Sequence, residues 1–157
     1  MAKTALMMTG AGSFSHALGA MLKVNGWKIL ASSGTTLFLR EQSVEAADVY
    51  DGKAKGTGER ELAACDIAKA ILGDKAELTK LGVDSIDLVA VTLTRRVDHS
   101  IDFGGTTILL AALHGGKMVV NEDTEHAAIL TCLREEMTPF VRVNLHIEAR
   151  KQLANHC

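Results

Sequence analysis

Apolar and polar residues follow one another in blocks whose lengths match strands and helices. Short, nearly continuous apolar runs are typical of strands buried on both faces of a parallel sheet. Between these runs, apolar residues recur at helical spacing, as at Phe14, Leu18 and Leu22. We expect strands over residues 4–9, 27–31, 46–50, 86–93 and 117–121, and helices from residue 14 to Asn25-Gly26 and over 36–41, 59–72, 105–113 and 125–134.

This alternation of strands and helices predicts the fold class. It indicates an α/β protein, a three-layer sandwich around a doubly wound, mainly parallel five-stranded sheet. A chain of 157 residues is long enough for one well-buried domain, so we expect a single domain over residues 1–157. We expect residues 138–157 to be mostly helical and to pack on the sheet, and their apolar residues indicate a homodimer interface.

Composition argues against several classes of function. A formal charge of −2 and six Phe, Tyr and Trp residues provide neither a basic face nor stacking platforms for nucleic acid. No apolar run approaches the roughly 20 residues that span a bilayer. The three cysteines form no CxxC motif, and His16 and His126 lack ligand-like spacing. We therefore expect a cytoplasmic protein without a metal, a disulfide framework or a membrane partner.

Gly-Thr-Thr occurs twice, each time at the start of a predicted helix. The first copy lies in SSGTT (Ser32–Thr36), and the second is Gly105–Thr107. Ligands of open α/β sheets bind at the carboxyl ends of the strands, and helix N-termini there attract anions. The alternative is that these serines and threonines only cap helices.

Two further loops carry charged residues. Arg95, Arg96, His99 and Asp102 follow the strongest predicted strand, and a His and an Asp three residues apart suit proton transfer. Lys53, Lys55 and Glu59 lie in DGKAKGTGER. Solvated loop residues are the alternative for both groups. A dinucleotide site is disfavoured, because Ser15 stands where GxGxxG requires its third glycine.

Four segments together resemble the methylglyoxal synthase-like domain family. They are GWKILASSGTTLFLRE, YDGKAKG, GVDSIDLVAVTL and IDFGGTTILLAA, within a likeness over residues 4–135. The last two are most similar to the IMP cyclohydrolase domain of the bifunctional purine enzyme, which has IDLVVVNL-like and IDIGGPTMLRAA segments. The resemblance implies a phosphorylated purine ribotide as ligand, closure of formyl-AICAR to IMP with loss of water, no cofactor, and a separate AICAR transformylase as partner.

The resemblance also implies roles for individual residues. Lys55 and Lys53 match the lysine and arginine of the cyclohydrolase DGRVKT motif, Asp102 matches its IDIGG aspartate, and His114 falls on a second lysine. These matches imply catalytic roles for Lys55, Asp102, His114 and His99. They imply ligand or phosphate binding by Ser32, Ser33, Gly34, Thr35, Thr36, Lys53, Gly104, Gly105 and Thr106.

The chain departs from the cyclohydrolase pattern in its first loop. Met8, Gly10 and Gly12 fall on the positions of a phosphate-binding SVSDK motif. This departure leaves open a non-catalytic nucleotide-binding regulatory module. A methylglyoxal synthase acting on dihydroxyacetone phosphate is the other alternative. His99 and Asp102 match the PHDPD motif of that enzyme, and Glu59 is the nearest counterpart in sequence of its catalytic aspartate.

Overall fold

The computed structural model describes residues 2–50, 57–92 and 103–120. Their strands form one five-stranded sheet in the order β3-β2-β1-β4-β5, in which all neighbours are parallel. The predicted α/β fold is therefore confirmed. In chain order the elements are β1 (Thr4–Met8), α1 (Ser13–Val24), β2 (Lys28–Ala31), α2 (Ser33–Glu41), β3 (Ala47–Asp48), α3 (Thr57–Ile71), α4 (Lys75–Leu81), β4 (Leu88–Val91), α5 (Phe103–His114) and β5 (Met118–Val120).

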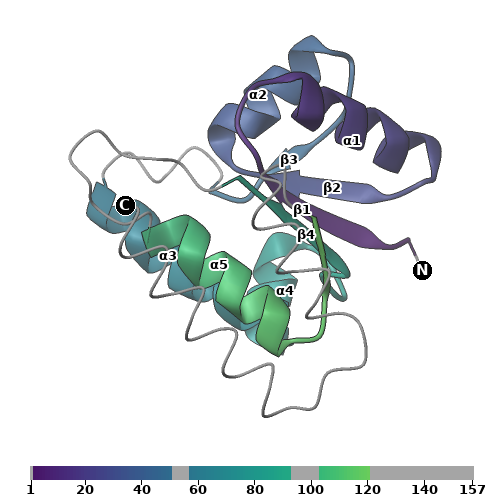
Figure 1. Ribbon diagram of the computed structural model, residues 1–157. Helices are drawn as coiled ribbons and strands as arrows, with labels where there is room; N and C mark the ends of the chain where they lie inside the picture. Colours follow the sequence, from purple (N-terminus) through teal and green to yellow (C-terminus); the bar gives the residue numbers. More distant parts are fainter. Residues whose placement is uncertain (1, 51–56, 93–102, 121–157) are drawn as a thin grey trace.

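The sheet lies between two layers of helices (Figure 1). Successive strand residues point to opposite faces, and in β1 both faces are apolar. Ala5 and Met7 belong to a core cluster with residues of α1 and α2. Leu6 belongs to a second cluster, with residues of α3, α4 and α5. The short apolar runs of the sequence are thus explained by burial on both sides, as the three-layer prediction requires.

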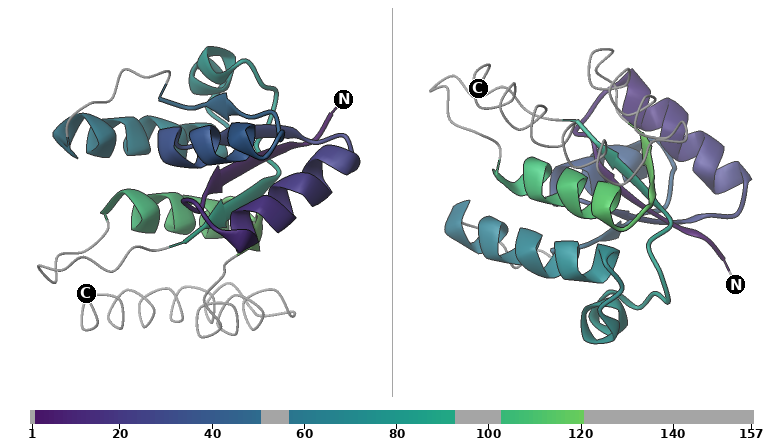
Figure 2. Two further views of the ribbon diagram at one scale, coloured as in Figure 1. Left: turned by 90° about the horizontal axis from the view of Figure 1, so that it is seen from above. Right: turned by 60° about the horizontal axis from the view of Figure 1, so that its bottom comes forward.

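Strand order creates a switch point beside β1. The chain proceeds from β1 outward through β2 to β3 and then crosses to β4 on the other side of β1, and β5 is the last strand of the described residues. Helices α1 and α2 accompany the first half of this path, and α3, α4 and α5 the second (Figure 2). Ligands of doubly wound folds bind at the carboxyl ends of the strands near such a point.

Two glycines allow close contact between helices. A Cβ on Gly115 would lie 3.1 Å from the Ala111 carbonyl oxygen and 3.4 Å from that of Ile71, where α5 ends beside the end of α3. A Cβ on Gly19 would lie only 2.7 Å from Leu39 Cδ2, where α1 packs on α2. Both helix pairs therefore depend on a missing side chain to keep their spacing.

The structure differs from the predicted elements in three places. Helix α4 is absent from the prediction; Asp74 caps it, its Oδ1 accepting bonds from the N–H groups of Ala76 (2.9 Å) and Glu77 (3.1 Å). Strand β3 has two residues, because Asp48 Oδ1 accepts a bond from the Tyr50 N–H and starts a turn. Helix α2 begins at Ser33, earlier than predicted. The predicted helix 125–134 and the tail 138–157 lie outside the described residues.

Candidate anion-binding site

The ends of β1 and β2 bring two loops together at the carboxyl edge of the sheet. β1 ends at Met8 and leads through residues 9–12 into α1, while β2 ends at Ala31 and leads directly into α2. The Ser32 N–H donates to the Met7 carbonyl oxygen at 3.1 Å, so the start of α2 continues the pairing of the two strands.

The Thr35 side chain joins these two loops. Its Oγ1 accepts bonds from the backbone N–H groups of Thr9 (3.2 Å) and Gly10 (2.9 Å), and it lies 3.0 Å from Ser32 Oγ. Thr35 is completely buried. Since a buried N–H without a partner is costly, this hydroxyl fixes the β1–α1 loop relative to α2.

The hydroxyls of Ser15 and Thr36 also bond within the protein. Ser15 Oγ lies 2.6 Å from Thr9 Oγ1 and 2.8 Å from the Gly10 carbonyl oxygen. Thr36 Oγ1 donates to the Ala31 carbonyl oxygen at 3.2 Å. The sequence predicts Thr35 and Thr36 as ligand donors, but the structure gives both hydroxyls internal partners. Ser15 is missing from the predicted site, although its place at the third glycine position of a GxGxxG-like segment, Gly10–Ser15, is a signal.

The first backbone N–H groups of α1 and α2 are open. Gly12 and Ser32 are the N-cap residues, and neither helix has a side-chain cap hydrogen bond. The first N–H groups bonded to their own helix are those of His16, to the Gly12 carbonyl (3.1 Å), and Thr36, to the Ser32 carbonyl (2.7 Å). Within the described part of the chain, no partner is found for the N–H groups of Ser13, Phe14, Ser15, Ser33, Gly34 and Thr35.

The electrostatics of this edge suit an anion. Open N–H groups and the helix dipole give each N-terminus a partial positive charge. The first turns of α1, α2 and α5 contain no acidic residue. Gly34 is exposed, and a Cβ built on it would meet nothing within 4 Å. A small anion therefore has room to reach the start of α2.

The other predicted site residues fall into two groups. Gly104, Gly105 and Thr106 lie in the first turn of α5, at the carboxyl edge. His114 is the last residue of the same helix and is exposed. At 1.5 Å per residue it is about 15 Å from Gly104, so one chain does not bring His114 to this edge.

Most of the charged residues predicted for the site lie outside the described residues. Glu59 lies in the first turn of α3. Lys53, Lys55, His99 and Asp102 lie outside the described residues. Among the residues that the structure does describe, no group of three or more His, Cys, Asp or Glu side chains gathers where it could hold a metal ion.

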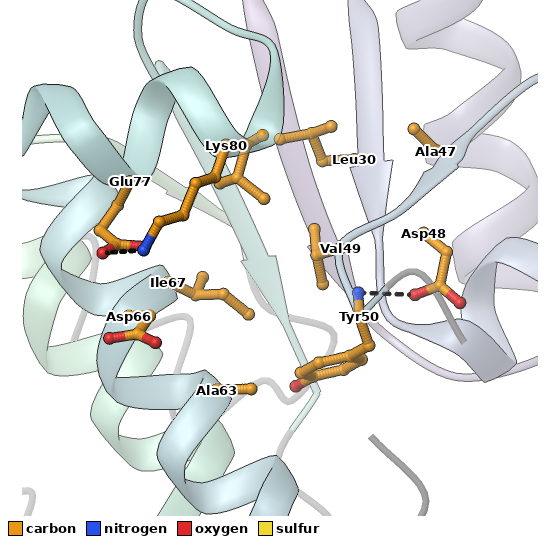
Figure 3. A pocket seen from close by; sticks show the side chains of 11 residues that line it. Leu30, Ala47, Asp48, Val49, Tyr50, Ala63, Asp66, Ile67, Glu77 and Lys80 are labelled. Carbon is orange, nitrogen blue, oxygen red and sulfur yellow. Dashed lines mark hydrogen bonds and ion pairs between the residues drawn. The ribbon is translucent and has the colours of Figure 1, made fainter. Parts of the chain in front are cut away.

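A cavity of about 400 Å³ lies on the face of the sheet that α3, α4 and α5 cover, between β3 and helices α3 and α4 (Figure 3). Asp48, Asp66 and Glu77 line it together with a single cation, Lys80. Lys80 pairs with Glu77 at 2.7 Å, and the excess of carboxylates disfavours a phosphate. The candidate anion site is therefore at the carboxyl edge and not in this cavity.

Comparisons with known proteins support the fold. No family model and no curated protein sequence matches the chain. A solved structure named ForH is similar, with a TM-score of 0.58, 20% sequence identity, and coverage of 99% of this chain and 94% of that one. At this identity the likeness shows a shared fold alone. In the described part of the chain, no helix is long and apolar enough to cross a membrane.

Proposed function

We propose that the protein binds a phosphorylated purine ribotide at the start of α2 and closes formyl-AICAR to IMP, as an IMP cyclohydrolase-type enzyme. The observation that carries the proposal is the pair of open N-termini of α1 and α2, joined by Thr35 and free of acidic residues in their first turns. The sequence resemblance supplies the purine and the reaction; the geometry supports a phosphate.

The phosphate is held mainly by backbone groups in this proposal. The N–H groups of Ser33 and Gly34 donate to its oxygens, and the Ser33 hydroxyl adds a donor. Charge-assisted bonds of this kind are about twice as strong as neutral ones. This arrangement makes Thr35 and Thr36 supports for the phosphate loop, whereas the sequence suggests that they bind the ligand directly.

Ring closure needs two proton transfers. The carboxamide nitrogen of formyl-AICAR attacks the formyl carbon and loses one proton, the formamide nitrogen loses a second, and the formyl oxygen takes up both protons and leaves as water. The resemblance assigns these tasks and the stabilisation of the developing oxyanion to Lys55 and Asp102. No redox partner is required, because the step only forms a C–N bond and expels water.

A nucleotide-binding module without turnover is the second candidate. The position of His114 favours it, since this exposed residue at the far end of α5 does not reach the carboxyl edge of its own chain. A cyclohydrolase-like domain lacking its second proton-transfer residue would bind the ribotide without turning it over.

The test combines binding with turnover. Purified protein is heated with AICAR, IMP, AMP, dihydroxyacetone phosphate or inorganic phosphate, and a hundredfold excess over Kd is expected to add about 2.7 kcal/mol of stability. IMP formation from formyl-AICAR is then followed, with an established cyclohydrolase as positive control. Purine-ribotide binding with turnover supports the enzyme, and binding without turnover supports the module. Stabilisation by the triose phosphate alone, or by nothing, contradicts both.

A further inference from the structure

One buried hydroxyl near the candidate site has no partner. Thr92 Oγ1 is the single buried side-chain nitrogen or oxygen for which the described part of the structure provides no hydrogen bond. Leaving such a group unpaired costs free energy, and retained exceptions call for an explanation such as an absent ligand. Thr92 directly follows β4, next to the switch point of the sheet.

Hydrogen bonds to β1 position Thr92 relative to the open start of α2. The Thr92 N–H donates to the Met8 carbonyl oxygen at 3.1 Å, and the Ser32 N–H donates to the neighbouring Met7 carbonyl oxygen, also at 3.1 Å. Since β2 and β4 pair with opposite sides of β1, Thr92 and Ser32 lie on either side of that strand. Thr92 and Ser32 are therefore separated by two strand spacings, which correspond to about 10 Å.

Strand alternation places the Thr92 side chain on the same face of the sheet as α1 and α2. Leu88 and Ala90 pack in the core cluster of that face, while Val89 and Val91 pack in the opposite cluster. The next residue that points toward α1 is therefore Thr92. Although its hydroxyl oxygen is buried, Thr92 as a whole is only half-buried. A change of χ1 rotamer moves the hydroxyl within the space that the side chain can reach.

We propose that the Thr92 hydroxyl binds the base end of the ligand whose phosphate lies at the start of α2. This inference rests on the proposed function and assigns the side chain that contacts the base of its ribotide. A ligand that touches both places must span about 10 Å across β1. A phosphate, a pentose and a base together cover such a distance. A triose phosphate has only three carbons and does not, and neither does free phosphate.

The test compares Thr92→Val, which removes the hydroxyl and keeps the shape, with Thr92→Ser, which keeps the hydroxyl. Binding of AICAR and of inorganic phosphate to each variant is measured by calorimetry, together with the melting temperature of the free protein. We expect Thr92→Val to bind AICAR about tenfold more weakly, to bind phosphate as the wild type does, and to melt no earlier. Thr92→Ser is expected to restore most of the AICAR affinity.

Three results would overturn the inference in different ways. Unchanged AICAR affinity in Thr92→Val, with a wild type that binds AICAR, removes Thr92 from the site and leaves the proposed function standing. A wild-type protein that binds neither AICAR nor phosphate contradicts both the Thr92 inference and the proposed function. A wild-type protein that binds dihydroxyacetone phosphate more tightly than AICAR also contradicts the inference that the ligand spans about 10 Å across β1. If Thr92→Val does not fold, the wild-type comparison of AICAR with dihydroxyacetone phosphate still decides the question of length.

Discussion

The first backbone N–H groups of α4 have a side-chain acceptor, whereas those of α2 have none among the described residues. At α4, the Asp74 carboxylate accepts the bonds of two backbone N–H groups, and Glu77 places a negative charge in the first turn. At α2, Ser32 occupies the cap position but makes no capping bond, and the first turn has no acid. A capped N-terminus needs nothing more, whereas an open one has donors and a partial charge to offer a ligand.

Side chains also donate hydrogen bonds to backbone carbonyl groups in turns away from the carboxyl edge. Lys28 Nζ donates to the Gly82 carbonyl oxygen at the end of α4 (2.6 Å), and Lys23 Nζ donates to the Ser43 carbonyl oxygen (2.7 Å). Ser43 has a φ of 61°, and this bond helps to hold that turn. The contrast indicates that the open N–H groups of α1 and α2 are a local feature of the carboxyl edge.

Breaking the support of the open site is expected to have the largest effect. Thr35→Val keeps the buried shape but leaves the Thr9 and Gly10 N–H groups without their acceptor. We expect the free energy of unfolding to fall by about 3 kcal/mol, measured by chemical denaturation. Thr36→Val loses one bond, to the Ala31 carbonyl, and serves as the milder control. Equal, small losses in both variants would contradict the role of Thr35 as the link between the loops.

A charge at the open N-terminus should change binding without harming the fold. Gly34→Asp places a carboxylate in the first turn of α2, where an added Cβ has no neighbour within 4 Å. It should repel a phosphate and weaken AICAR binding at least tenfold, while helix stability is kept or improved by a few tenths of a kcal/mol. The neutral control is Gly34→Asn. Equal affinities of the two variants would show that no anion binds there.

Removing the cap of α4 should have a smaller effect that is confined to stability. Asp74→Ala leaves the Ala76 and Glu77 N–H groups without their acceptor and is expected to cost about 1 kcal/mol. Thermal unfolding measures the loss, and calorimetry with AICAR should give an unchanged Kd. A matching loss of affinity would mean that the two N-termini are not independent.

The smallest effect is expected at the exposed pair Asp66–Lys69, whose charged atoms are 2.9 Å apart. The hydrogen bond and charge of Lys69 hold the pKa of the Asp66 carboxyl below its ordinary value. The stabilisation is therefore present at neutral pH and is lost as the pH falls through this lowered pKa. We expect Lys69→Gln to raise the Asp66 pKa, followed by NMR titration, with little change in melting temperature at pH 7. An unchanged titration would contradict the pairing.

The sequence is most informative where a pattern has a single physical cause. Two-faced burial makes the apolar run at 86–93 readable as a strand buried on both faces, and Ser32–Thr36 is correctly placed at a strand-to-helix junction. The role of Thr35 is not readable, because its partners Thr9 and Gly10 are some 25 residues away and meet it only once β1 and β2 pair. For the same reason, nothing in the sequence distinguishes the satisfied hydroxyl of Thr36 from the unsatisfied hydroxyl of Thr92.

Phosphate binding by the open N–H groups of α2 can be tested directly. The direct test is to follow backbone amide resonances of isotope-labelled protein during titration with AICAR and, separately, with its riboside, which lacks the phosphate. We expect AICAR to shift the Ser33 and Gly34 resonances, the riboside to leave them in place, and the resonances of Ala76 and Glu77 at the capped α4 to move with neither. Equal shifts with AICAR and the riboside, or no shift at Ser33 and Gly34, would contradict phosphate binding at α2.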